Sequence, residues 1–103
     1  MSLTVHTQQG PVQFDGPHTS TASLLAQSGV YVISTIINGL HKVLDVGESE
    51  NIQNRVGSHD RKDQWTPHIS DRLYVSACYC SAVERMALES AVRGTHNPPC
   101  GIR

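Results

Sequence analysis

Several features are scarce or missing in this chain of 103 residues. No stretch reaches the roughly eighteen consecutive apolar residues of a membrane span, and no cationic leader precedes an apolar segment, so neither a span nor a secretory signal is readable. The three cysteines are an odd number and form no disulfide framework. Reduced thiols in a cytoplasmic protein with no membrane association are therefore expected.

A surplus of positive charge is also lacking. Eight Lys and Arg stand against nine Asp and Glu, which gives a formal net charge of −1 with six histidines neutral. A protein that binds nucleic acid by itself is usually clearly basic, because neutralised phosphates supply much of its affinity. If this chain acts on nucleic acid, it is expected to be delivered there by a protein partner or by self-association.

The cysteines leave one metal site open as a weaker alternative. Zinc is held by sulfur and nitrogen ligands, and the chain offers Cys78, Cys80, His96 and Cys100. Structural zinc sites usually have wider spacing between paired cysteines than Cys78 and Cys80 have. Two cysteines on an apolar strand are more often ordinary core residues.

The length and an apolar content of 38% predict one compact soluble domain with a single core. Residues 1–28 are polar and broken by glycine and proline, and we expect an N-terminal extension that packs on the core, with short strands at 3–5 and 12–14 and a short helix near 20–26. Residues 29–103 then form the main domain. Its expected elements are strands at 30–37, 41–46 and 73–80, and helices at 50–58 and 81–93.

Local signals set the boundaries of these elements. Asn38-Gly39 predicts a hairpin turn, and Ser49 is the expected cap of the first helix. The charged segment 60–67 ends at a proline and is predicted to be a loop. Ser81 with Glu84 resembles a capping box, and Gly94 is expected to end the last helix. The fold class is therefore α/β in the α+β sense, with a three-stranded mixed or antiparallel sheet flanked by helices.

Polar residues in two of these elements suggest chemistry on a phosphodiester. Asn51, Arg55 and His59 recur at four-residue steps, which places them on one face if the helix extends that far. Arginine suits phosphate because its planar fork bonds two oxygens and stays charged. Glu89 is an oxygen donor of the kind that Mg²⁺ accepts. Tyr31 opens an apolar strand, and an arginine and a metal nearby would lower its pKa enough to accept a proton from water.

In order and spacing, these residues resemble the GIY-YIG nuclease superfamily over roughly residues 29–101. Gly29-Val30-Tyr31 stands where that family has its first triplet, and Asp45-Val46-Gly47 stands in the position of the second. Arg55 and His59 follow at the family's distances. Glu89, followed by Asn97-Pro98-Pro99-Cys100, is similar to the family's last motif.

The resemblance implies a divalent-metal-dependent DNA endonuclease that uses Mg²⁺ or Mn²⁺ at one site. Tyr31 would activate water, Arg55 would stabilise the phosphate, His59 would assist proton transfer, and Glu89 would hold the metal. Asp45, in the second motif, joins the catalytic set. The residues expected to contact the substrate are Asn51, Arg61, Lys62 and Asn97.

Two departures from the family pattern leave alternatives open. Asp45 replaces the second motif tyrosine and Gly101 replaces the terminal asparagine, so a catalytically inactive binding or regulatory module is the competing function. The register of the hairpin also bears on Asp45. A strict two-residue turn would pair Tyr31 with Val46 and turn Asp45 to the other face, whereas a longer loop or a bulge would place Asp45 beside Tyr31.

Overall fold

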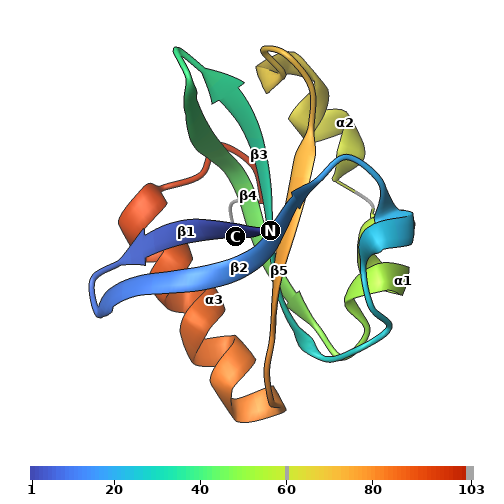
Figure 1. Ribbon diagram of the computed structural model, residues 1–103, viewed down its shortest axis with the longest axis vertical. Helices are drawn as coiled ribbons and strands as arrows, with labels where there is room; N and C mark the ends of the chain where they lie inside the picture. The colour runs from blue at the N-terminus through green and yellow to red at the C-terminus, as the bar shows by residue number, and fades with distance from the viewer. Residues whose placement is uncertain (60, 102–103) are drawn as a thin grey trace.

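Five antiparallel strands make one sheet in the order β1-β2-β5-β3-β4, in a computed structural model that describes residues 1–59 and 61–101 (Figure 1). The strands are β1 (Ser2–Thr7), β2 (Gly10–His18), β3 (Gly29–Ile37), β4 (Leu40–Ser49) and β5 (Tyr74–Tyr79). The α+β class is confirmed. The predicted count of three strands was wrong, because the N-terminal segment supplies two more strands to the same sheet.

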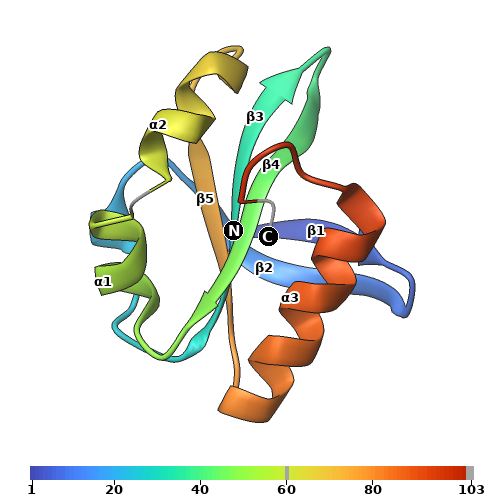
Figure 2. The ribbon, with the colours of Figure 1, turned by 180° about the vertical axis from the view of Figure 1, so that it is seen from behind.

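Three α-helices cover the two faces of the sheet. Short helices α1 (Ile52–Gly57) and α2 (Lys62–Trp65) lie on one face, and α3 (Ala82–His96) lies on the other (Figures 1 and 2). Two single-turn 3₁₀ helices, η1 (Thr21–Ser23) and η2 (Thr66–His68), complete the connections. The sheet is therefore buried on both sides over its centre.

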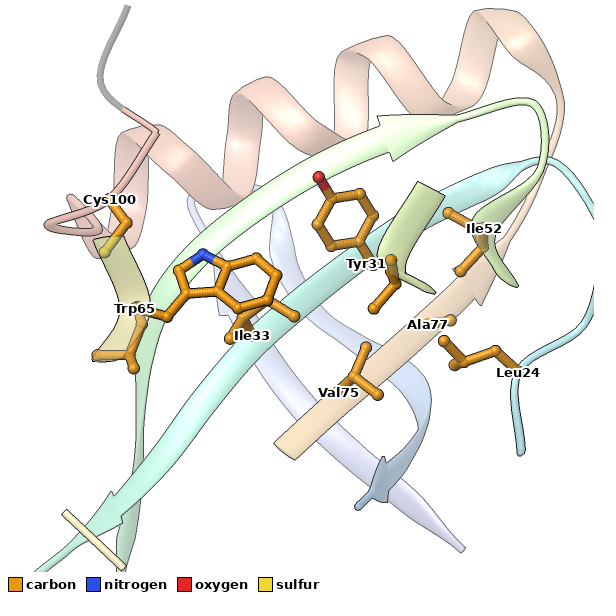
Figure 3. Packing of buried hydrophobic residues seen from close by; sticks show 10 residues of the cluster. Leu24, Tyr31, Ile33, Ile52, Trp65, Val75, Ala77 and Cys100 are labelled. Atoms are coloured by element: carbon orange, nitrogen blue, oxygen red, sulfur yellow. The ribbon is translucent and has the colours of Figure 1, made fainter. Parts of the chain in front are cut away.

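The alternation of side chains along β3 divides the core into two clusters. Val30 and Val32 point into what we call the Phe14 cluster, which Phe14 shares with Val92 of α3. Side chains at alternate positions belong to the opposite face. Tyr31 lies on that face, in what we call the Tyr31 cluster, drawn in Figure 3; its members are Leu24, Tyr31, Ile33, Leu44, Ile52, Val56, Trp65, Val75, Ala77 and Cys100.

Two predictions for the segment around the first two helices were wrong. Asn51, not Ser49, caps α1, and its side chain accepts a hydrogen bond from the Asn54 amide. Segment 60–67, predicted as a loop, contains α2 and the start of η2, while Asp60 lies outside the described residues. The capping box of Ser81 and Glu84 is confirmed at the start of α3.

The last helix passes Gly94 and ends at Asn97, which adopts a left-handed conformation with φ of 51°. A glycine inside a helix costs only about 1 kcal/mol relative to alanine. Contacts with the first hairpin offset that cost: the Gln8 amide donates to the Thr95 hydroxyl at 3.1 Å, and the His96 ring lies 2.8 Å from the His6 carbonyl. The tertiary contacts therefore extend the helix by one turn.

Replacement of Phe14 tests whether the N-terminal strands are part of the core. Phe14 has an exposed fraction of 0%, so Phe14→Ala is expected to lower the free energy of unfolding by about 3–5 kcal/mol. Chemical denaturation followed by circular dichroism measures the change. Gln13→Ala, at an exposed position of the same strand, is the control and should change stability by less than about 0.5 kcal/mol. Equal effects of the two substitutions would contradict this account of β2.

Candidate functional site

A β-bulge decides which side chains share a face of the β3–β4 hairpin. The Asn38-Gly39 turn joins Ile37 to Leu40, but the register shifts so that Ser34 pairs with Val43 while Ile33 pairs with Asp45. The extra residue on β4 reverses the alternation beyond the bulge. Of the two arrangements left open by the sequence, the bulged one is present. Asp45 therefore lies on the face of Tyr31, and Tyr31 pairs with Gly47.

Gly47 leaves room for the ring of Tyr31. A Cβ atom added to Gly47 would collide with the phenol oxygen and the ring of Tyr31, so only glycine permits this packing. The ring has an exposed fraction of 1%. In Figure 3 its oxygen points toward β4, away from Val75 and Ala77. Tyr31 thus combines a buried ring with an oxygen directed out of the hydrophobic cluster.

His59 contacts this oxygen. Its Nε2 hydrogen-bonds the Tyr31 hydroxyl, and the two rings meet edge to face with centroids 5.3 Å apart. The backbone amide of Arg61 donates to His59 Nδ1 at 3.0 Å. A neutral imidazole with Nδ1 as acceptor carries its proton on Nε2. His59 therefore donates to the Tyr31 oxygen, and the phenol proton is available to another acceptor.

The pKa of Tyr31 moves opposite to the sequence-based expectation. Burial raises this pKa to about 12 from its ordinary 10.0. The charges of Arg61 and Arg55, and a hydrogen bond from Arg55, act in the lowering direction, but burial outweighs them. The phenol is therefore neutral at neutral pH, and its anion would be a strong base.

A polar cavity of about 180 Å³ lies beside the Tyr31 oxygen, and its lining consists of Tyr31, Gly47, Glu48, Arg55 and Arg61. Arg55 comes from α1 and Arg61 from the turn before α2. The carboxylate of Glu48 is paired with Arg85, with Nε 2.5 Å from Oε2. Two guanidinium groups and a phenol beside one small cavity suit an anionic oxygen ligand such as phosphate. We call this space the Tyr31 cavity.

Asp45 does not line the Tyr31 cavity among the described residues. Its side chain is 0% exposed, and four donors surround the carboxylate: Arg61 Nε at 2.9 Å, Arg93 Nη2 at 3.1 Å, Trp65 Nε1 at 2.8 Å and the Val46 amide at 2.8 Å. Burial raises the pKa of Asp45, but hydrogen bonds from Arg61, Trp65 and Arg93 outweigh it and hold the pKa below its ordinary value. Asp45 is thus an ionised internal carboxylate that holds Arg61 in place.

The C-terminal tail closes over this carboxylate. The Cys100 amide donates to the Leu44 carbonyl at 3.0 Å, and Arg93 Nη1 donates to the Cys100 carbonyl at 3.1 Å. Gly101 follows with φ of 71°, and a Cβ there would lie 2.5 Å from Asp45 Oδ1. Glycine at 101 is therefore matched to Asp45, because a larger residue would collide with the carboxylate.

Glu89 is not among the described residues that line the Tyr31 cavity. It lies on α3 with an exposed fraction of 3%, and Arg93 Nε donates to its Oε1 at 3.2 Å. Arg93 also binds Asp45, so this arginine connects the carboxylate of Glu89 to the carboxylate of Asp45. Glu89 is therefore a buried carboxylate and not an exposed surface charge.

The predicted substrate contacts are dispersed. Asn51 caps α1, and Asn97 caps α3. Lys62 donates to the Gly57 carbonyl at 2.8 Å and is absent from the described lining of the Tyr31 cavity, whereas Arg61 is present there. The predicted helical face of Asn51, Arg55 and His59 was also wrong in part, because only Arg55 lies within α1.

The cysteines do not come together. Cys100 belongs to the Tyr31 cluster, whereas Cys78 and Cys80 pack against the Phe14 cluster on the other face. Burial raises the pKa of all three thiols. Within residues 1–59 and 61–101, no group of three or more His, Cys, Asp or Glu side chains is arranged to hold a metal ion.

Two residues of the site were not predicted from the sequence. Glu48 lines the Tyr31 cavity. Arg93 binds Asp45, Glu89 and the Val46 carbonyl. The spacing of four residues between Glu89 and Arg93 is a sequence signal for their ion pair, but it does not indicate the contact with Asp45.

Comparison with known proteins found no matching family model, no matching curated protein and no matching solved structure. Across the described part of the chain, no helix has the length and apolar character needed to cross a membrane.

Asp45→Asn tests the structural role of this carboxylate. The substitution keeps the shape but leaves Arg61 and Arg93 without their shared negative partner, and we expect the free energy of unfolding to fall by about 3–5 kcal/mol. Urea denaturation measures the loss. Asp15→Asn, at a carboxylate that is 49% exposed, is the control, with an expected change below about 1 kcal/mol. A loss for Asp45→Asn no larger than the control would contradict the role of Asp45.

The same variant tests the lowered pKa of Asp45. A carboxylate with a lowered folded-state pKa contributes stability above its unfolded-state value, and this contribution is lost as pH falls through the folded pKa. The stability difference between wild type and Asp45→Asn should therefore be constant above about pH 5 and shrink below about pH 4. Urea denaturation across this range measures it. A difference that does not change down to the acid limit of folding would refute the assignment.

Proposed function

We propose that this protein is a divalent-metal-dependent endonuclease that hydrolyses DNA phosphodiester bonds. The observation that carries the proposal is the convergence of Tyr31, Arg55 and Arg61 on one cavity, with His59 bonded to the Tyr31 oxygen. The resemblance of the sequence to the GIY-YIG nuclease superfamily supports the same reaction. Tyr31 of β3 points to the face of the sheet that is covered by α1 and by the turn before α2.

Arg55 and Arg61 bind the phosphate in this proposal. Charge on the nonbridging oxygens increases as water attacks phosphorus, and fixed guanidinium groups stabilise that charge without having to reorganise. Arg61 is held by Asp45 at 2.9 Å, so its position is set before substrate arrives. Asp45 therefore acts through Arg61 and has no direct contact with the reacting atoms in this proposal.

Tyr31 is the proposed base. Its oxygen receives a hydrogen bond from His59, which orients the phenol and stabilises its anion. With a pKa raised to about 12, the anion is rare at neutral pH but strongly basic when formed. The two arginines favour the anion in the same place where they bind phosphate. Proton removal from water and stabilisation of the phosphate charge are thereby coupled.

Glu89 is the proposed ligand of Mg²⁺ or Mn²⁺. A bound divalent cation supplies Lewis-acid stabilisation of the phosphate and leaving oxygens. A carboxylate has two oxygens and roughly four lone-pair positions, which fits a shared interaction with Arg93 and a hard cation. The burial of Glu89 at 3% exposure supports a fixed position for this carboxylate.

Delivery to DNA is proposed to depend on a partner protein or on self-association. The net charge of −1 supplies little long-range attraction to DNA. A specific observation also favours a second function, a binding or regulatory module without catalysis. Arg93 binds both Asp45 and Glu89, so the two carboxylates of the family-like motifs hold one structural arginine.

Cleavage assays on matched variants separate the two functions. Pure protein is incubated with branched, single-stranded and plasmid DNA in Mg²⁺ or Mn²⁺. We expect Tyr31→Phe to lower the cleavage rate by about 10²–10⁴-fold, because a general base is lost. Arg55→Lys should lower the rate by about 10²–10³-fold, because the bidentate contact is lost. Glu89→Gln should raise the metal concentration needed for half-maximal cleavage.

The matched controls are Tyr74→Phe, Arg72→Lys and Glu50→Gln, none of which alters the described lining of the Tyr31 cavity. Each should leave cleavage within about threefold of wild type, the size of a change of about 0.7 kcal/mol. Absence of cleavage on every DNA substrate, or equal effects in the test and control variants, would reject the nuclease and favour the binding module.

A further inference from the structure

A second cavity lies on the same face of the sheet as Tyr31 but shares no described lining residue with the Tyr31 cavity. It occupies about 230 Å³ between the β2–η1 connection, α2 and the start of β5. Neither the sequence motifs nor the proposed nuclease reaction uses it. We call it the Trp65 cavity, after the largest side chain of its wall.

The floor of the Trp65 cavity is apolar. Ile33, Trp65 and Val75 belong to the Tyr31 cluster and line the cavity; Ile33 and Val75 come from the sheet and Trp65 from α2, which lies over the same face (Figure 3). Polar residues, including Thr21 and Thr66, are part of the remaining lining. An apolar floor with a few polar groups is the usual composition of a small-molecule site.

The charge of the lining has one sign. Of the described residues that line this cavity, none is Asp or Glu, and the basic ones are His18 and Lys62. The Lys62 ammonium donates to the Gly57 carbonyl at 2.8 Å, and an ammonium has three donors. His18 lies 3.1 Å from Asp15. Lys62 is therefore the described lining residue whose positive charge could attract an anionic ligand.

The volume limits the size of the ligand. An apolar protein cavity of about 150 Å³ holds one benzene molecule, and drug-sized ligands usually occupy about 300 Å³ or more. At about 230 Å³, the Trp65 cavity fits one aromatic ring with a short substituent. We propose that it binds a small aromatic ring carrying an anionic group, with the ring against Trp65, Ile33 and Val75 and the anion at Lys62.

This ligand chemistry has two sources, an aryl phosphate or a simple aromatic carboxylate. Trp65 is the single tryptophan of the chain, so its fluorescence reports directly on the cavity. Titration with phenyl phosphate and with benzoate tests the two sources, while benzyl alcohol lacks the anion and inorganic phosphate lacks the ring. We expect saturable fluorescence changes with at least one of the two anionic ring compounds, and about tenfold weaker binding when either the ring or the anion is missing.

Substitutions test whether the probe binds in the Trp65 cavity. Lys62→Met should weaken the ring-anion probe by about tenfold, whereas Lys42→Met, at an exposed position of β4, should not. Thr66→Phe, at an exposed lining position, should block entry of the ring while the fold is retained, as judged by circular dichroism. Arg55→Met should leave the fluorescence response intact, because Arg55 lines the other cavity.

The proposal is overturned if neither anionic ring compound gives a saturable response, or if inorganic phosphate binds as well as phenyl phosphate. Loss of binding in Arg55→Met, or normal binding in Thr66→Phe, would mean that the probe does not bind in the Trp65 cavity. Either result would also overturn the proposal. These readouts do not involve DNA cleavage. The Trp65 cavity can therefore succeed or fail independently of the proposed nuclease reaction.

Discussion

The carboxylate of Asp45 is the constraint on which the arrangement of this molecule depends. It is fully buried, and its donors come from three places: Arg61 and Trp65 in and before α2, Arg93 in α3, and the Val46 amide within β4. A buried charge without partners would cost several kcal/mol, so these partners are obligatory. The carboxylate of Asp45, on the edge strand β4, therefore connects α2 and α3, which lie on opposite faces of the sheet.

This constraint explains the position of the Tyr31 cavity. Arg61 reaches the cavity only because its Nε is held by Asp45, and Trp65 contacts His59 with ring centroids 4.8 Å apart while its own N–H is bound to the same carboxylate. His59 in turn bonds Tyr31. Arg61 is thus held by Asp45 directly, and His59 contacts a tryptophan that is bound to the same carboxylate. Asp45 is therefore a structural carboxylate that positions Arg61, not an additional acid that lines the cavity.

Much of the fold could be predicted from local patterns, and the failures have physical reasons. The strand β3 is rich in β-branched residues, and the α3 capping box is a local motif, so both were visible in the sequence. The extent of β1 and β2 was underestimated because β2 contains two glycines and two prolines. The pairing of β2 with β5 is long-range and leaves no local mark in the sequence. The bulge on β4 shifts the pairing between Val43 and Asp45, and the alternation of side chains along the sequence does not predict this shift. In the site, Tyr31, Arg55 and His59 were found because their spacing is informative. The roles of Arg93 and Glu48 depend on contacts made across the sheet.

The order of the strands also constrains how the chain can be assembled. β2 pairs with β5 rather than with β3, so the hairpin of β1 and β2 can join the sheet only after β5 is available. A two-stranded hairpin by itself is marginal in water. During synthesis from the N-terminus, β1 and β2 therefore wait while β3, β4, α1 and α2 are made, and they join the sheet once β5 emerges. Phe14 and Val5 are exposed until α3 closes over them. The earliest part of the chain to be made is thus among the last to reach its native place, and its polar, proline-interrupted sequence limits aggregation during that interval.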